Sequence, residues 1–135
     1  MRRHTAAKSY YLFVGLFTLS ASFIWSVNTL FLLDSGLDLA EGFFANAIFT
    51  AALALAELPT GVFADSHGRR ASFLLGLVLL SLGSAGYLAA SFLEKPQWLF
   101  YGMSIVLGCG FAFHSGALEA WVVDELKAEG QAATL

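Results

Sequence analysis

Cysteine, proline and charge are all scarce in this chain. It has one cysteine, Cys109, and two prolines among 135 residues. A single thiol excludes an intramolecular disulfide and a cysteine-based metal site. Charged residues make up only 13% of the chain, whereas hydrophobic residues make up 58%, and the mean hydropathy is +0.71. A soluble domain of this size cannot hide so much apolar surface, so lipid is the expected solvent.

The sequence also lacks the patterns of most catalytic sites. It contains no glycine-rich phosphate loop, no cluster of metal ligands and no nucleophile with a credible base at the right spacing. We therefore do not expect an enzyme, and we predict neither a cofactor nor a metal ion. The net charge of -3 comes from separated clusters, so it does not indicate a nucleic-acid partner.

Four long apolar runs are the main positive feature. A helix rises about 1.5 Å per residue and the hydrocarbon core of a bilayer is about 30 Å thick, so about 20 apolar residues mark one crossing. Runs of this length exclude strands. The sequence predicts an all-α integral membrane protein of four antiparallel transmembrane helices, the first too long for the core of a secretory signal. The predicted spans are 9–33, 42–64, 71–93 and 97–123, between a terminal segment 1–8 and a tail 124–135.

Basic residues set the expected orientation, because lysine and arginine tend to stay on the cytoplasmic side. Six of the seven bases fall on one side of the predicted membrane, and Lys95 alone falls on the other. Both termini are therefore expected in the cytoplasm of a multi-pass cell-membrane protein. The six bases are Arg2, Arg3, Lys8, Arg69, Arg70 and Lys127.

The connection between the second and third predicted helices reads GVFADSHGRR over residues 61–70. Gly61 would let a neighbouring helix approach closely, and Gly68 suits a turn with a positive φ. The two arginines that follow would lie at the cytoplasmic lipid boundary. The carboxylate of Asp65 would be stabilised there by a helix N-terminus or by an arginine of an adjacent helix. It would then hold the cytoplasmic ends of two helices together.

The pattern G-x-x-x-D-x-x-G-R-R at this place resembles the signature loop of the major facilitator superfamily. The strings ELPTG over 57–61 and SGALEAW over 115–121 also resemble segments of bacterial members. The resemblance covers nearly the whole chain from Tyr10 to Asp124. It implies the first part of a twelve-helix transporter, whose remaining helices are missing from this chain and whose substrate lies near the midplane between two six-helix halves. It also implies residues that stabilise the outward-facing state and couple the two halves, namely Gly61, Asp65, Gly68, Arg69 and Arg70.

The chain departs from the family pattern in three places. Ser66 stands where the family usually has a basic residue, and Phe63 stands where it has leucine. The arginine that family proton antiporters commonly carry in the fourth helix is absent. The loop's charge network is therefore expected to be thinner, and drug–proton antiport is implied only at the level of the family.

Three acids near the predicted cytoplasmic boundary have two interpretations. Glu57 and Glu119 lie within about two turns of that boundary, given the helical rise of about 1.5 Å per residue. They are either charge partners for Arg69 or Arg70, which we favour, or proton-coupling groups. Asp124 belongs more clearly to the partner class.

The substrate-cavity candidates are Trp25, Asn28 and His114. Trp25 and Asn28 are three residues apart and share a helix face. In the resembled family the first and fourth helices line the cavity, which adds His114. A free imidazole titrates near neutral pH, so His114 would be suited to shuttle protons or to hydrogen-bond a substrate. The alternative for all three is a structural contact with a neighbouring helix.

The leading functional hypothesis is a secondary active transporter of a small organic solute or drug that works by alternating access, with protons as a candidate coupling ion. One alternative is a small four-helix dimeric proton-coupled exporter, which predicts an acid in the first helix that this chain lacks. Another is an inactive truncated membrane protein or a scaffold, which the abrupt ending after the fourth helix favours. The expected partners are the lipid bilayer, a small-molecule substrate, protons and the missing helices.

Overall fold

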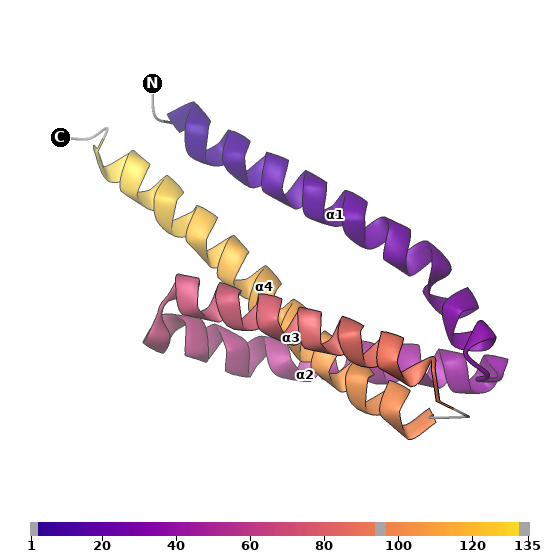
Figure 1. The fold of residues 1–135 in the computed structure, drawn as a ribbon. Helices are drawn as coiled ribbons and strands as arrows, with labels where there is room; N and C mark the ends of the chain where they lie inside the picture. Colours follow the sequence, from indigo (N-terminus) through magenta and orange to yellow (C-terminus); the bar gives the residue numbers. More distant parts are fainter. Residues whose placement is uncertain (1–2, 94–96, 133–135) are drawn as a thin grey trace.

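Four helices account for most of the chain. The computed structural model describes residues 3–93 and 97–132. Each helix contains a stretch long and apolar enough to span a membrane, so the predicted all-α membrane fold is confirmed. The positions 1–2, 95 and 133–135, which entered the predictions of orientation and terminal segments, lie outside the described residues. The helices are α1 (Arg3–Asp34), α2 (Leu39–His67), α3 (Arg69–Ala90) and α4 (Gln97–Ala132) (Figure 1).

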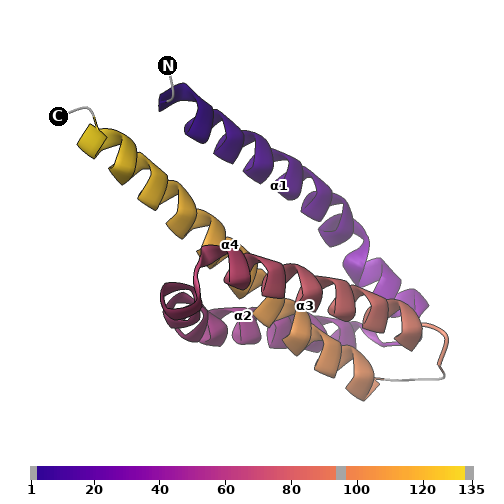
Figure 2. The ribbon, with the colours of Figure 1, turned by 60° about the vertical axis from the view of Figure 1, so that its left-hand side comes forward.

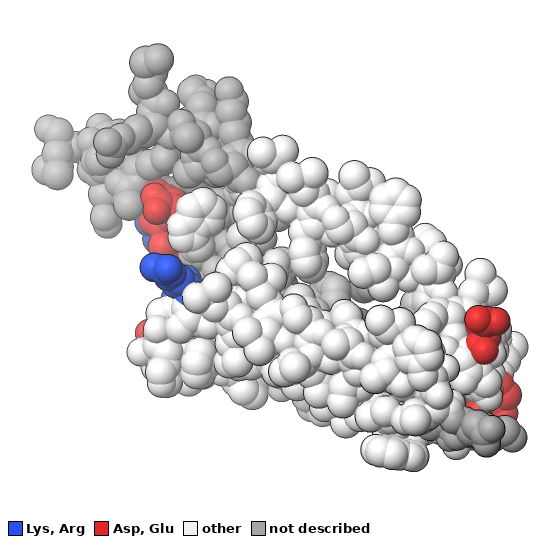
Figure 3. Space-filling view, viewed as in Figure 1, with Lys and Arg blue, Asp and Glu red and all other residues white. Residues whose placement is uncertain are grey.

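The helices run up and down. The start of α1, the turn between α2 and α3, and the last turns of α4 lie at one end, and the turn between α1 and α2, the end of α3 and the start of α4 lie at the opposite end (Figure 1). On the face shown in Figure 3, the charged side chains gather at these two ends and the described surface between them is uncharged. This distribution suits a bundle whose middle lies in lipid.

The turn between α1 and α2 is fixed by local chemistry. Gly36 has a φ of 93°, and the amide of Leu37 donates to the carbonyl of Leu32 over 3.2 Å. This glycine-terminated ending satisfies the last carbonyls of α1. Asp38 then caps α2: its carboxylate accepts from the amide of Glu41, and the Glu41 carboxylate accepts from the amide of Asp38, each over 2.8 Å. The reciprocal pair satisfies two amides that the first helical turn leaves free.

Helices α2, α3 and α4 pack backbone to backbone through glycine. A Cβ placed on Gly108 of α4 would lie 2.6 Å from the carbonyl oxygen of Phe49 on α2. A Cβ placed on Gly76 of α3 would lie 2.8 Å from the backbone nitrogen of His114 on α4. Neither position has room for a side chain, so both glycines are required for the close approach that packs membrane helices. We call α2, α3 and α4 the three-helix unit.

Helix α1 is held mainly at its C-terminal end. Leu32 is fully buried there, and the ring of Phe31 lies 6.4 Å from the ring of Tyr87 and 6.3 Å from that of Phe100. Toward its N-terminus α1 diverges from α2 and α3 (Figures 1 and 2). Only 6% of its membrane-spanning stretch is buried, compared with 28% for α4. The chain therefore consists of a packed three-helix unit and a loosely attached first helix.

Candidate functional site

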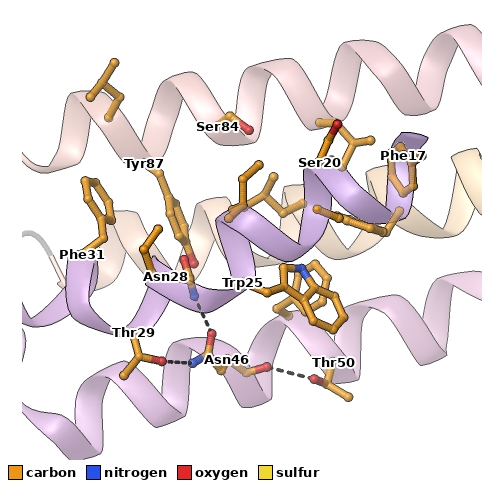
Figure 4. Close-up of a pocket in the computed structure, with 18 residues that line it drawn as sticks. Phe17, Ser20, Trp25, Asn28, Thr29, Phe31, Asn46, Thr50, Ser84 and Tyr87 are labelled. Carbon is orange, nitrogen blue, oxygen red and sulfur yellow. Dashed lines mark hydrogen bonds between the residues drawn. The ribbon is translucent and has the colours of Figure 1, made fainter. Parts of the chain in front are cut away.

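A cavity of about 680 Å³ lies between α1 and the three-helix unit. Figure 3 shows the surface hollowed below α1, and Figure 4 shows the interior of this space. All four helices contribute lining residues, and none of these residues is an acid, a lysine or an arginine. Most of the lining is apolar. The polar lining residues are Ser20, Asn28, Thr29, Asn46, Thr50, Ser84 and Tyr87.

Two asparagines join α1 to α2 across one side of the cavity. The side-chain amide of Asn28 donates to the Oδ1 of Asn46 over 2.8 Å, and both residues are half-buried (Figure 4). Asn46 also contacts the hydroxyl of Thr29 at 3.5 Å, and its backbone carbonyl accepts from Thr50 over 3.0 Å. We call Asn28 and Asn46 the amide pair. In an apolar cavity such groups are stable only with hydrogen-bonding partners.

An aromatic cluster lies one helical turn away. Trp25 of α1, Phe49 of α2 and Phe111 of α4 contact one another, with ring centroids 5.4 to 6.4 Å apart. Trp25 precedes Asn28 by three residues, and Phe49 follows Asn46 by three. Because α1 and α2 are antiparallel, Asn28 lies opposite Asn46 and Trp25 lies opposite Phe49. We call Trp25, Phe49 and Phe111 the aromatic cluster.

His114 lies outside this cavity. Its side chain is only 2% exposed, and its ring stacks on Phe17 of α1 with centroids 4.0 Å apart. Phe73 of α3 lies on another side, 5.1 Å away. Neither ring nitrogen has a hydrogen-bond partner within the described chain. Of the three cavity candidates, the structure therefore brings Trp25 and Asn28 together in the cavity and places His114 in a separate aromatic pocket.

The loop of residues 61–70 forms a network of ion pairs around one arginine. Arg69, in the first turn of α3, contacts the carboxylate of Asp65 at 2.7 Å and that of Asp124 at 3.3 Å. The network ties the end of α2 to α3 and to α4. Gly68 joins α2 to α3 with a φ of 92°, a conformation that costs little only for glycine.

Other predicted loop residues behave differently. Arg70 is exposed, as are Glu57 and Glu119, and none of the three forms an ion pair among the residues that the structure describes. The expected pairing of these two glutamates with arginine is thus not seen within this chain. Gly61 has no close helix neighbour among the residues that the structure describes, because nothing lies within 4 Å of a Cβ placed there. That face of α2 is therefore open within the described part of the chain.

Comparison with known proteins decides the family. The model of the Major Facilitator Superfamily matches residues 3–135. The chain belongs to the major facilitator superfamily. A protein of Bacillus subtilis (strain 168) named "Putative transporter YoaB" is 25% identical over 93 residues, which are 69% of this chain and 22% of that protein. The chain thus spans about a fifth of the length of this curated relative. No solved structure matches.

The sequence did not lead us to expect that α2 contributes to the cavity of this major facilitator superfamily chain. Asn46 and Phe49 complete the amide pair and the aromatic cluster, yet neither was a candidate. A usable signal was present, because Asn46 is the second of only two asparagines and lies inside an otherwise apolar span. Polar residues in membrane helices mark interhelical contacts or solute pathways.

Proposed function

We propose that this chain forms part of a secondary active transporter of the cell membrane that moves a small organic solute by alternating access. The observation that carries the proposal is the cavity between α1 and the three-helix unit, lined by Trp25 and Asn28. Family membership supports the proposal, because substrates of such folds bind near the midplane between helical bundles. Arg69 and Arg70 support a cytoplasmic location for both termini in this proposal, because basic residues tend to stay on that side.

The packing gives the proposed movement a physical basis. Glycine contacts at positions 76 and 108 make the three-helix unit a single body. Helix α1 is anchored to it by the buried Leu32 at one end and by the stacking of Phe17 on His114 toward the other. Tilting α1 about Leu32 would separate Phe17 from His114, change access to the cavity and leave the three-helix unit intact. Packed helices move in this way as rigid bodies about a few end contacts.

The loop serves in this proposal as a conformational latch. Arg69 holds Asp65 and Asp124 together at the cytoplasmic end, which keeps that end of α2, α3 and α4 closed. Gly61, with its open face, and the exposed Arg70 are available to helices beyond this chain. Charge-assisted pairs of this type break and re-form at modest cost when they are exposed. The latch is therefore suited to a reversible step.

Proton coupling is assigned to Glu57 and Glu119 as the second part of the proposal. Both lie on membrane-spanning helices, and both lack an ion-pair partner among the described side chains. An ionisable group in a membrane span is a candidate for carrying protons. Replacing either residue by glutamine should abolish the pH dependence of transport while preserving expression.

The experiment that tests the proposed function is solute transport in proteoliposomes made with the full gene product. Asn28→Leu should reduce transport, because it removes the amide from the cavity wall. Leu30→Val is the matched control, since Leu30 lies on α1 but does not line the cavity. Equal transport by Asn28→Leu and the control protein would contradict the placement of the site.

A further inference from the structure

We infer that the cavity takes an uncharged solute with a neighbouring hydrogen-bond donor and acceptor on a flat apolar body, of the carboxamide or lactam class. The inference rests on the proposed function and specifies the solute that the same site holds. Three features of the cavity carry it: the absence of charge from the lining, the free groups of the amide pair, and the position of the aromatic cluster.

The lining excludes a charged solute. None of the residues around the cavity is an acid, a lysine or an arginine. Glu57, Glu119 and Arg69 all lie outside the lining. An ion without a charged partner in an apolar, lipid-surrounded site carries a large desolvation cost. A neutral polar group has no such cost once its hydrogen bonds are made.

The amide pair supplies those hydrogen bonds. An asparagine side chain has two N–H donors and one carbonyl acceptor. Asn28 uses one N–H on Asn46, which is the one side-chain hydrogen bond that Asn28 makes among the described residues, so its Oδ1 is free to accept. The side-chain nitrogen of Asn46 contacts only Thr29, at the limiting distance of 3.5 Å. The pair therefore presents both an acceptor and a donor, which match the N–H and C=O of a carboxamide.

The aromatic cluster supplies the surface for the rest of the solute. Trp25 lies three residues from Asn28, which is about 4.5 Å along a helix that rises about 1.5 Å per residue. Trp25 is 63% exposed and lines the cavity, so part of the indole is available to a bound ring. The spacing fits a solute whose polar group is attached directly to a flat ring.

A cation is the competing occupant, because aromatic rings attract cations through their faces. The lining does not favour a cation. It contains no acid, so a cation in the cavity would lose its hydration without a charged partner. The neutral solute is therefore the better match.

The test uses the chain in lipid nanodiscs with Trp25 as the single fluorophore, made by Trp98→Phe and Trp121→Phe. The probes are benzamide, benzoate, benzylammonium and toluene, which share a ring and differ in charge and hydrogen bonding. Benzamide should quench the fluorescence of Trp25 saturably. Its dissociation constant should be about tenfold lower than that of each of the other three probes, which is the difference expected from one hydrogen bond. A chain with only Trp98, which lies away from the cavity, should show no saturable change.

Two variants locate the binding. Asn28→Leu should weaken benzamide about tenfold and leave toluene unchanged, because it removes hydrogen bonds and retains apolar contact. Asn28→Asp should reverse the preference toward benzylammonium, because it adds the charge that the lining lacks.

Either of two results overturns the inference. Tighter binding of benzylammonium or benzoate than of benzamide to the unmodified cavity shows that the solute class is charged, while the cavity and the proposed function stand. Absence of saturable binding by benzamide also refutes the inference. The transport measurement with Asn28→Leu decides the proposed function independently of both results.

Discussion

Asn28 of α1 donates a hydrogen bond to Asn46 of α2 across one wall of the cavity, at 2.8 Å. The contact lies where α1 begins to diverge from the three-helix unit. The hydrogen bond therefore joins α1 to α2 between the buried Leu32 and the Phe17–His114 stack.

Cysteines at positions 28 and 46 should crosslink rapidly with a short bis-methanethiosulfonate reagent. The background is Cys109→Ala, which removes the chain's single native cysteine. Crosslinking is read from mobility on a denaturing gel after cleavage between α1 and α2. The control pair combines position 46 with Leu30, which is 65% exposed and does not line the cavity. Equal crosslinking of the two pairs would show that α1 does not have this face toward α2.

Glycine contacts determine the stability of the three-helix unit. Gly108→Ala should destabilise the chain, because the new methyl group would lie 2.6 Å from the Phe49 carbonyl oxygen and 2.9 Å from the Leu53 amide nitrogen. Overpacking of this kind costs about 1–3 kcal/mol. The measurement is the free energy of unfolding in mixed micelles.

Gly116→Ala is the matched control for that variant, because nothing lies within 4 Å of a Cβ at Gly116 in the same helix. Alanine is the better helix former by about 1 kcal/mol, so this substitution should be neutral or stabilising. If both alanine variants have the same stability, the backbone contact between α2 and α4 at Gly108 is not present.

The ion pairs of Arg69 should contribute little to stability. The side chains of Asp65 and Asp124 are 69% and 57% exposed, and an exposed pair contributes about 0.2–1 kcal/mol. Asp124→Asn should lower the melting temperature slightly in dilute salt, and 1 M NaCl should remove the difference by screening. A large difference that persists at high salt would show that the network is buried in the native assembly.

Arg69→Lys should lower the melting temperature as slightly as Asp124→Asn does. It should reduce transport more than Asp124→Asn does. Arginine contacts one carboxylate through Nη1 and the other through Nε. Lysine has a single ammonium group and cannot reproduce this fork. Wild-type transport by the lysine variant would contradict the role of the two-sided contact.

The aromatic pocket around His114 predicts a stabilising substitution. His114→Phe retains stacking on Phe17 and removes two ring nitrogens that have no partner within the described chain. An unpaired buried polar group costs about 1–3 kcal/mol, so phenylalanine should raise the free energy of unfolding. His114→Ala should lower it, because the ring leaves a void. Destabilisation by phenylalanine would reveal a hydrogen-bonding partner for the imidazole.

The sequence predicted the elements well and the contacts between them less well. Apolar length is a local property, so the four helices followed from hydropathy, and the need for glycine at position 68 followed from the short turn. The amide pair depends on the register of α1 against α2. That register is symmetric about the turn, because Asn28 lies nine residues before Leu37 and Asn46 nine after it.

The location of His114 was not predictable in the same way. It depends on which face of α4 meets Phe17 of α1, a contact between helices far apart in the sequence. No local pattern encodes that rotation. The open face at Gly61 has a similar origin, because a glycine in an apolar helix indicates that close approach is allowed, but not which helix approaches.

The most direct test of the central claim is the reactivity of a cysteine at position 28 toward a membrane-impermeant maleimide in right-side-out and inverted vesicles. Asn28→Cys is made in the Cys109→Ala background, and Leu30→Cys is the control that lies outside the cavity. A thiol reacts as the thiolate and therefore needs water. The proposed alternating cavity predicts labelling of position 28 from both sides and protection by bound solute, with position 30 unreactive. No labelling of position 28 from either side, or equal labelling of both positions, would contradict it.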